Sequence, residues 1–161
     1  MKFKRLAVAA ACALVSSMAF AEAHFVRGPT ASLSSSGDYV VSFKEVGLGN
    51  IPVTYSLVAN EAIYTYQCFN PAGNTPVGEP NGVKESDASV FVTMQPRNGQ
   101  ITGSVTLSPS PGDARCQGNA MKMCLVAVSY SGVWFKEETT PVGPFSMPSL
   151  SMTLSKPDCD I

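Results

Sequence analysis

Basic residues, histidine and long apolar runs are scarce in this sequence of 161 residues. It contains 11 Lys and Arg against 12 Asp and Glu, a single histidine (His24) and a single tryptophan (Trp134). Binding to nucleic acid needs several Lys or Arg that converge on phosphates, and the sequence has no such cluster. The lack of a basic cluster also argues against a polybasic patch that binds a membrane surface. The apolar runs are too short for a membrane span, which takes about 20 residues. We therefore expect no nucleic-acid partner and no membrane-spanning segment.

Residues 1–21 have the features of a secretory signal peptide. This segment opens with three basic residues, continues with the apolar run LAVAAACALV and ends in the small-residue stretch SSMAFA. Cleavage after Ala21 is favoured, with cleavage after Ala23 as the alternative. Removal of the segment leaves eight basic against twelve acidic residues, a net charge of −4. We expect one secreted domain over residues 22–161 that acts outside the cell.

Four cysteines lie outside the expected signal peptide: Cys68, Cys116, Cys124 and Cys159. An even number in an exported chain predicts two disulfides, for which three pairings exist. We favour Cys68–Cys116, since both residues lie at junctions between a predicted strand and a loop. We favour Cys124–Cys159 because the tail can reach back to the strand that carries Cys124. A zinc site is the weaker alternative, since the sequence has no C-x-x-C pair.

Apolar residues recur at every second position, which predicts strands, and no segment shows a convincing helical period. In DYVVSFKEV (38–46), for example, Tyr39, Val41 and Phe43 share one side. The Asn-Gly pair in PRNGQ (96–100) predicts a hairpin. Further strands are expected at 30–34, 52–59, 62–69, 88–94, 100–108, 122–130, 133–138 and 150–155.

About eight or nine strands in one domain predict an immunoglobulin-like antiparallel β-sandwich. A jelly roll or a small closed barrel is the alternative. The longest expected connections are residues 69–87 and 109–120. The first is rich in Asn, Pro and Gly, so we expect a loop that is either functional or mobile.

His24 is the candidate metal ligand. If the chain starts at Glu22, the amine, two deprotonated backbone amides and the imidazole supply four nitrogens in the square plane that Cu(II) favours. A start at His24 would provide half of the histidine brace of lytic polysaccharide monooxygenases, but the required second histidine is missing. An incidental residue on a frayed end is the simpler interpretation. No cofactor other than Cu(II) is suggested.

Catalytic arrangements have little support in the sequence. A Ser-His-Asp or Cys-His arrangement would have to use His24. Glu137 and Glu138 are neighbours on a predicted strand, so they point to opposite sides and cannot form the facing carboxylates of a glycosidase. Scattered positions suggest that the remaining acids serve surface solubility; they include Glu45, Glu61, Asp87 and Asp113.

Trp134 is the candidate binding residue. On a strand it faces away from Phe135, so one of the two side chains is expected in the core and the other at the surface. An exposed tryptophan on a β-sandwich can stack on a sugar ring or anchor a protein partner. A core position for Trp134 is the favoured interpretation of the two.

Four segments resemble a family of small secreted microbial β-sandwich proteins without an assigned activity: GPTASLSSSGDYVVSFKEVGLGN (28–50), TYQCFN (65–70), PRNGQITG (96–103) and LVAVSYSGV (125–133). The resemblance covers residues 28–133 and transfers no residue role. We expect a non-enzymatic binding protein of the extracellular space or cell surface. Its ligand is expected to be a wall polysaccharide or a host surface, so the partner is a polysaccharide or a cell-surface protein. The alternatives are a Cu(II)-binding protein that uses His24 and a small secreted hydrolase.

Overall fold

The computed structural model describes residues 22–72, 76–117, 120–140 and 142–159, so the expected signal peptide lies outside the described residues. The described part consists of strands, turns and loops, and it contains no helix that could cross a membrane. The all-β prediction is therefore confirmed. The strands are β1 (His24–Leu33), β2 (Tyr39–Val46), β3 (Val53–Phe69), β4 (Pro76–Met94), β5 (Gln100–Leu107), β6 (Lys122–Glu137), β7 (Phe145–Met147) and β8 (Leu150–Asp158).

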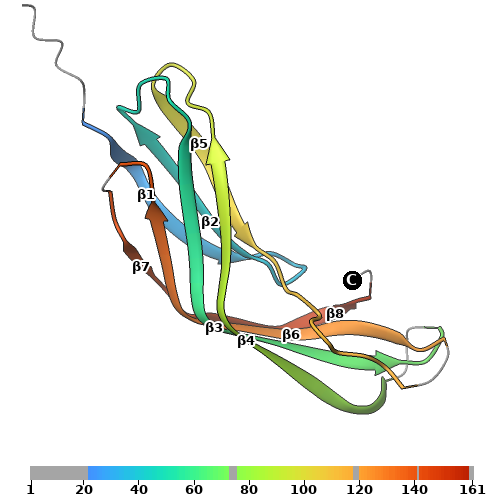
Figure 1. Cartoon of the computed structure of the whole chain (residues 1–161). Coiled ribbons are helices and arrows are strands. Elements are labelled where there is room, and N and C mark those ends of the chain that lie inside the picture. Colours follow the sequence, from blue (N-terminus) through green and yellow to red (C-terminus); the bar gives the residue numbers. More distant parts are fainter. Residues whose placement is uncertain (1–21, 73–75, 118–119, 141, 160–161) are drawn as a thin grey trace, which may run out of the picture.

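The strands form two antiparallel sheets that pack face to face as a β-sandwich (Figure 1). The small sheet has the order β1-β2-β5. The large sheet has the order β4-β3-β6, and both β7 and β8 pair with β6 at different places along its length. The sandwich prediction is confirmed, with eight strands in the described part.

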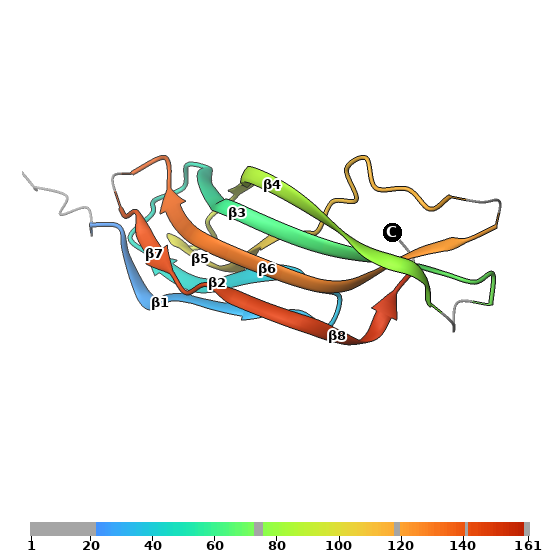
Figure 2. The same cartoon turned by 90° about the horizontal axis from the view of Figure 1, so that it is seen from below.

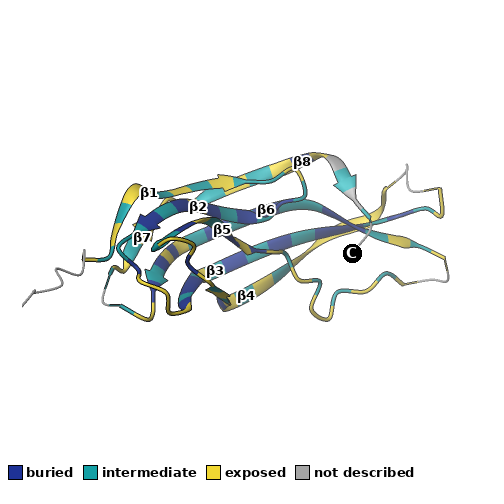
Figure 3. Cartoon of the chain, turned by 90° about the horizontal axis from the view of Figure 1, so that it is seen from above, coloured by how far each residue is buried: buried dark blue, intermediate teal, exposed yellow. Residues whose placement is uncertain are grey.

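Alternating side chains from both sheets build the core between them. Tyr39, Val41 and Phe43 of β2 are buried, as the alternation predicts. On β3, Tyr55 and Leu57 are fully buried and face β2 across the sandwich. Aromatic rings fill much of this space, with the rings of Phe43 and Tyr55 only 4.5 Å apart. Figure 3 shows the buried residues concentrated on β2, β3 and β6, while β4 is exposed along much of its length.

Three strands are much longer than expected. The segments 52–59 and 62–69 form one continuous strand, β3, and 122–130 and 133–138 likewise form β6. Most of the loop predicted at 69–87 belongs to β4, so that prediction is wrong. As the edge of the large sheet, β4 pairs on one side only and can include Pro76 and Pro80, because prolines are tolerated where a backbone N–H is not needed for pairing.

The large sheet bends where Asn60 of β3 lies between Asp87 of β4 and Gly132 of β6. Asp87 and Gly132 both have positive φ, 54° and 59°. On β3 the buried face changes at this row, because Ala59 and Ala62 are both fully buried although three positions apart. Beyond the bend β8 pairs with β6 as far as Leu125. The far ends of β3, β4 and β6 then continue past the small sheet as a three-stranded ribbon (Figures 1 and 2).

We expect Gly132→Ala to lower the free energy of unfolding by about 2 to 3 kcal/mol, since a non-glycine residue at positive φ is strained and the new methyl group has no room. A Cβ at this position would lie 2.8 Å from the side-chain nitrogen of Asn60. Urea denaturation followed by circular dichroism measures the change. Gly82→Ala in β4 is the control, because its Cβ would meet only Ile63 at 3.9 Å. Equal stability of the two variants would contradict this account of the bend.

The Asn98–Gly99 turn connects the two sheets. Both residues have positive φ, and Arg97 and Gln100 form a bridge across the turn. The predicted turn is therefore present, but the expected hairpin does not extend from it. β4, which precedes the turn, belongs to the large sheet, and β5, which follows it, belongs to the small sheet.

Candidate functional site

Trp134 lies on the outer face of the large sheet, with 41% of its surface exposed. Its neighbour Phe135 points the opposite way and is fully buried among the core aromatics. The prediction that the two rings face opposite sides is confirmed, and the favoured core position for Trp134 is wrong. The reason is the register, because Trp134 pairs with Val58 of β3 and Phe135 pairs with the fully buried Leu57.

Phe91 of β4 is a second exposed aromatic residue on the same face. It is 64% exposed, the largest exposed fraction among the big apolar side chains of the described residues. Phe91 pairs with Ser56, and Ser56 pairs with Lys136, which is two positions from Trp134. Strand spacing of about 4.8 Å and a rise of about 3.3 Å per residue place the Cα atoms of Phe91 and Trp134 about 12 Å apart. We call Phe91, Trp134, Ser56 and Val58 the aromatic face.

The polar side chains beside the aromatic face are paired with one another. Lys136 forms an ion pair with Glu138 at 2.5 Å, and the hydroxyl of Ser56 donates to Glu138 at 2.5 Å. These two contacts hold the pKa of the Glu138 carboxyl below its usual value. The hydroxyls of Thr54 and Thr93 lie 2.9 Å apart in the next row. The surface around the two rings is thus polar but carries no unpaired charge among these residues.

Phe91 was not predicted as a site residue, although the sequence contains a signal for its exposure. In ASVFVTM (88–94), Ala88, Val90 and Val92 lie on one side of the strand. Phe91 lies on the other side, together with Ser89 and Thr93. A large aromatic residue between two polar ones on one side of a strand indicates an exposed ring. That Phe91 and Trp134 lie close together depends on the strand pairing, which the alternation does not reveal.

His24 begins β1 and is exposed. The Nδ1 atom of its ring lies 2.8 Å from the carbonyl oxygen of Glu22. Among the residues that the structure describes, no group of three or more His, Cys, Asp and Glu side chains could hold a metal ion. The Cu(II) hypothesis uses backbone amides and a free amine, depends on the processing site, and stays a prediction.

Two carboxylates lie in the core, although Glu45 was expected at the surface. Glu45 and Glu137 are both fully buried, so the solubility interpretation of Glu45 is wrong. The hydroxyl of Tyr55 donates to Glu45 at 2.7 Å, while the other oxygen of Glu45 has no partner among the described residues. Burial raises the pKa of the Glu45 carboxyl, the Tyr55 hydrogen bond lowers it, and the nearby Glu137 raises it further.

Glu137 is held differently, by the turn that follows β6. Its carboxylate accepts hydrogen bonds from the backbone N–H groups of Thr139 and Thr140 and from the hydroxyl of Thr140. Glu45 and Glu137 are therefore structural groups in this conformation, since full burial denies a substrate access to either. Neither of these two acids lies in a cleft, where a glycosidase needs its pair of carboxylates.

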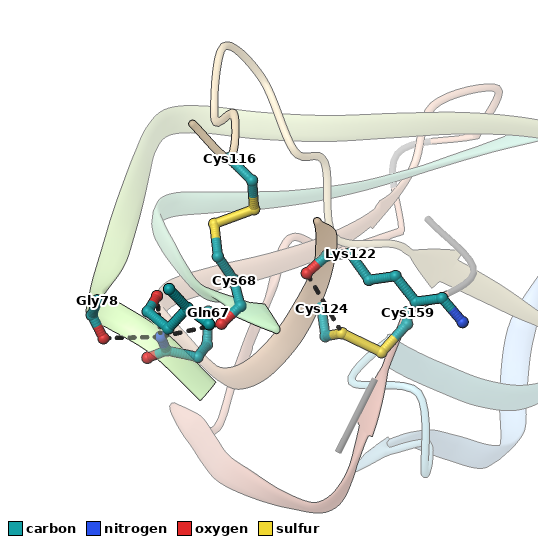
Figure 4. The surroundings of a disulfide bond; sticks show 8 residues. Gln67, Cys68, Gly78, Cys116, Lys122, Cys124 and Cys159 are labelled. Carbon is teal, nitrogen blue, oxygen red and sulfur yellow. Dashed lines mark hydrogen bonds between the residues drawn. A yellow bond between two sulfur atoms is a disulfide. The ribbon is translucent and has the colours of Figure 1, made fainter. Parts of the chain in front are cut away.

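The two disulfides are Cys68–Cys116 and Cys124–Cys159, the pairing that we favoured from the sequence (Figure 4). The first connects the end of β3 to the loop before β6, and the second connects β6 to the end of β8. Beside the first, the amide of Gln67 donates to the carbonyl oxygens of Val77 and Gly78 at 3.0 and 2.9 Å. These contacts hold the far end of the ribbon together.

Comparison of the chain with protein-family models, with curated proteins and with solved structures finds no match. The function must therefore come from the geometry of the aromatic face and of the rest of the molecule.

Proposed function

We propose that this protein is an extracellular binding protein that holds an uncharged polysaccharide on the aromatic face. The observation that carries the proposal is the pair of exposed rings, Phe91 and Trp134, on one open side of the large sheet. Single exposed apolar residues are common on protein surfaces, but two large rings two positions apart on one sheet face form a platform. About 12 Å between their Cα atoms lets an extended sugar chain contact both rings at once.

The chemistry around the rings favours a sugar over a protein partner. Aromatic rings offer an apolar surface for the C–H side of a sugar ring, and the hydroxyls of Thr54 and Thr93 and the polar ends of Lys136 and Glu138 lie beside them. Because Lys136 and Glu138 neutralise each other, an uncharged ligand meets no unpaired charge. A protein interface would normally have a continuous apolar centre, whereas the buried, polar Ser56 lies between these two rings.

The proposed setting is outside the cell. Two disulfides are typical of oxidising compartments, and residues 1–21 have the pattern of an export signal. A binding protein needs no catalytic group on this face, and the buried positions of Glu45 and Glu137 fit that requirement. A wall polysaccharide of a microbe, or a glycan on a host surface, is the ligand that we expect.

Affinity electrophoresis through gels that contain cellulose derivatives, soluble chitin or yeast glucan tests the proposal. We expect at least one polysaccharide to retard the protein. Trp134→Ala and Phe91→Ala should each weaken the binding roughly tenfold or more, because a central aromatic contact contributes about 2 kcal/mol. Ile51→Ala is the control, since Ile51 is 58% exposed but lies in the loop before β3.

Two results would contradict the proposal. One is the absence of retardation by every polysaccharide of the set. The other is retardation that both aromatic substitutions leave unchanged. A loss of binding with Ile51→Ala equal to that with Trp134→Ala would show a nonspecific apolar effect and would also overturn it.

A further inference from the structure

A loop replaces the small sheet where the ribbon of β3, β4 and β6 extends beyond it. The small sheet ends at Tyr39 and Leu107, the paired residues of β2 and β5. The described residues 108–117 then run along the ribbon before β6 begins (Figures 1 and 2). We call the described residues 108–117 the covering loop.

Three contacts hold the covering loop against the ribbon. The Cys68–Cys116 disulfide fastens it to the end of β3. Ala114 packs against the hydrophobic core, and its backbone N–H donates to Pro111 within the loop at 2.9 Å. A Cβ on Gly112 would lie 3.3 Å from the side chain of Val83 in β4. The loop therefore has a fixed position beside β4.

A hollow of about 630 Å³ opens between β4 and the covering loop. This volume is within the usual range for small-molecule sites, about 300–1,000 Å³. Its polar and charged lining consists of Asn81, Lys84 and Glu85 from β4, and of Ser110, Asp113 and Arg115 from the loop.

The charged groups of the hollow have both signs, and three of the four have no ion-pair partner among the described residues. Lys84 forms an ion pair with Glu61 of β3. Among the described residues, Glu85, Asp113 and Arg115 have no ion-pair partner. The β4 wall thus offers the unpaired acid Glu85, and the loop wall offers Asp113 and Arg115. Asn81 and Ser110 add groups that both donate and accept hydrogen bonds.

Tyr66 adds a buried hydroxyl close to Glu85. Tyr66 is buried on the ribbon, and its hydroxyl has no hydrogen-bond partner among the described residues. Burial raises the pKa of Tyr66 to about 12, and the negative charge of Glu85 contributes to the rise. The hydroxyl therefore stays protonated at neutral pH, and Glu85 lies close enough to influence it.

We propose that this hollow is a second binding site, which takes one or two units of an uncharged sugar. Sugar hydroxyls donate and accept hydrogen bonds at once, and they match walls on which donors and acceptors alternate. A ligand with a net charge would meet repulsion from one of the two unpaired signs. The site does not depend on the aromatic face, which lies on the other side of the bend and on the outer surface of the sheet.

Titration of ¹⁵N-labelled protein with cellobiose and with N-acetylglucosamine, followed by NMR, tests this site. We expect the amide signals of residues 81–85 and 112–115 to shift with one of the two sugars. Arg115→Ala should weaken that binding about tenfold, since it removes a charged hydrogen-bond donor. Arg27→Ala is the matched control, because Arg27 is an exposed arginine of β1, in the small sheet.

The same titration on the Trp134→Ala variant separates the two sites. Shifts that persist there and vanish with Arg115→Ala establish the hollow as an independent site. Shifts confined to residues 89–93 and 134–136 would assign the sugar to the aromatic face alone and overturn this inference. The absence of any shift at residues 81–85 and 112–115 at saturating sugar would overturn it as well, whether or not the aromatic face binds a polysaccharide.

Discussion

Glu137→Ala is expected to lower the free energy of unfolding by about 3 to 4 kcal/mol, because it leaves several buried hydrogen-bond donors without an acceptor. The Glu137 carboxylate accepts from the backbone N–H of Thr139 at 2.5 Å and from that of Thr140 at 2.8 Å, as well as from the Thr140 hydroxyl. Removing it leaves these donors unpaired and also leaves a small cavity beside Tyr55.

Two further variants make this experiment specific. Glu137→Gln keeps the shape and one acceptor oxygen, so we expect an intermediate loss. Glu138→Ala removes the adjacent acid, whose side chain is partly exposed, and should cost only about 1 kcal/mol, because a surface ion pair and one hydroxyl contact are lost. Chemical denaturation of the three variants at pH 7 measures the differences. Equal losses for Glu137→Ala and Glu138→Ala would show that the turn after β6 does not depend on the buried carboxylate.

Stability is expected to fall as the pH rises from mildly acidic to neutral, because of Glu45. Its pKa in the folded protein is raised above the usual 4.5, first by burial and then by the neighbouring Glu137. The folded state therefore holds this proton more tightly than the unfolded state does. The corresponding stabilisation is fully present below pH 4.5 and is lost as the pH rises through the folded pKa.

Other acids act in the opposite direction at lower pH. Burial acts to raise the pKa of Asp38, but hydrogen bonds from Ser108, Ser34 and Ser36 outweigh it and the pKa is lowered. The ion pair with Lys136 lowers the pKa of Glu138. The stabilisation from these two groups is present above their unfolded pKa values and is lost as the pH falls through the folded ones. We therefore expect maximum stability at mildly acidic pH.

Glu45→Gln isolates the effect of the buried carboxyl. The variant has no proton to lose, so its stability should decline less between pH 4 and pH 7 than the stability of the wild type. Tyr55→Phe should make the decline steeper, because it removes the hydrogen bond that favours the ionised form. Denaturation curves at a series of pH values give both results. Parallel pH profiles for the wild type and Glu45→Gln would contradict this assignment.

Alternation along single strands was sufficient to predict much of the core. Tyr39, Val41 and Phe43 point inward because side chains of a strand alternate and the small sheet has one face on the core. The same alternation extends to Glu45, which belongs to the inward set. We assigned it to the surface because the acids are scattered along the sequence. Only the packing of Tyr55 from the other sheet reveals the donor that accompanies Glu45.

The lengths of the strands could not be read from local composition. Asn60 and Glu61 resemble a turn between two strands, and Gly132 resembles another, yet β3 and β6 continue through both places. The pairing of three strands decides this outcome, because positive φ at Gly132 and Asp87 bends the sheet while the register is the same on both sides of the bend. For the same reason the glycine- and proline-rich segment after Pro76 forms an edge strand instead of a long loop.

Composition, spacing and alternation thus sufficed for an all-β sandwich with two disulfides and for a ring of Trp134 or Phe135 on the surface. Each of these properties depends on neighbours in the chain or on the count of a residue type. The aromatic face, the buried carboxylates and the hollow beside the covering loop were decided by strand register and by the packing of one sheet on the other. Those relations join residues far apart in the chain, such as Phe91 and Trp134, and no local pattern encodes them.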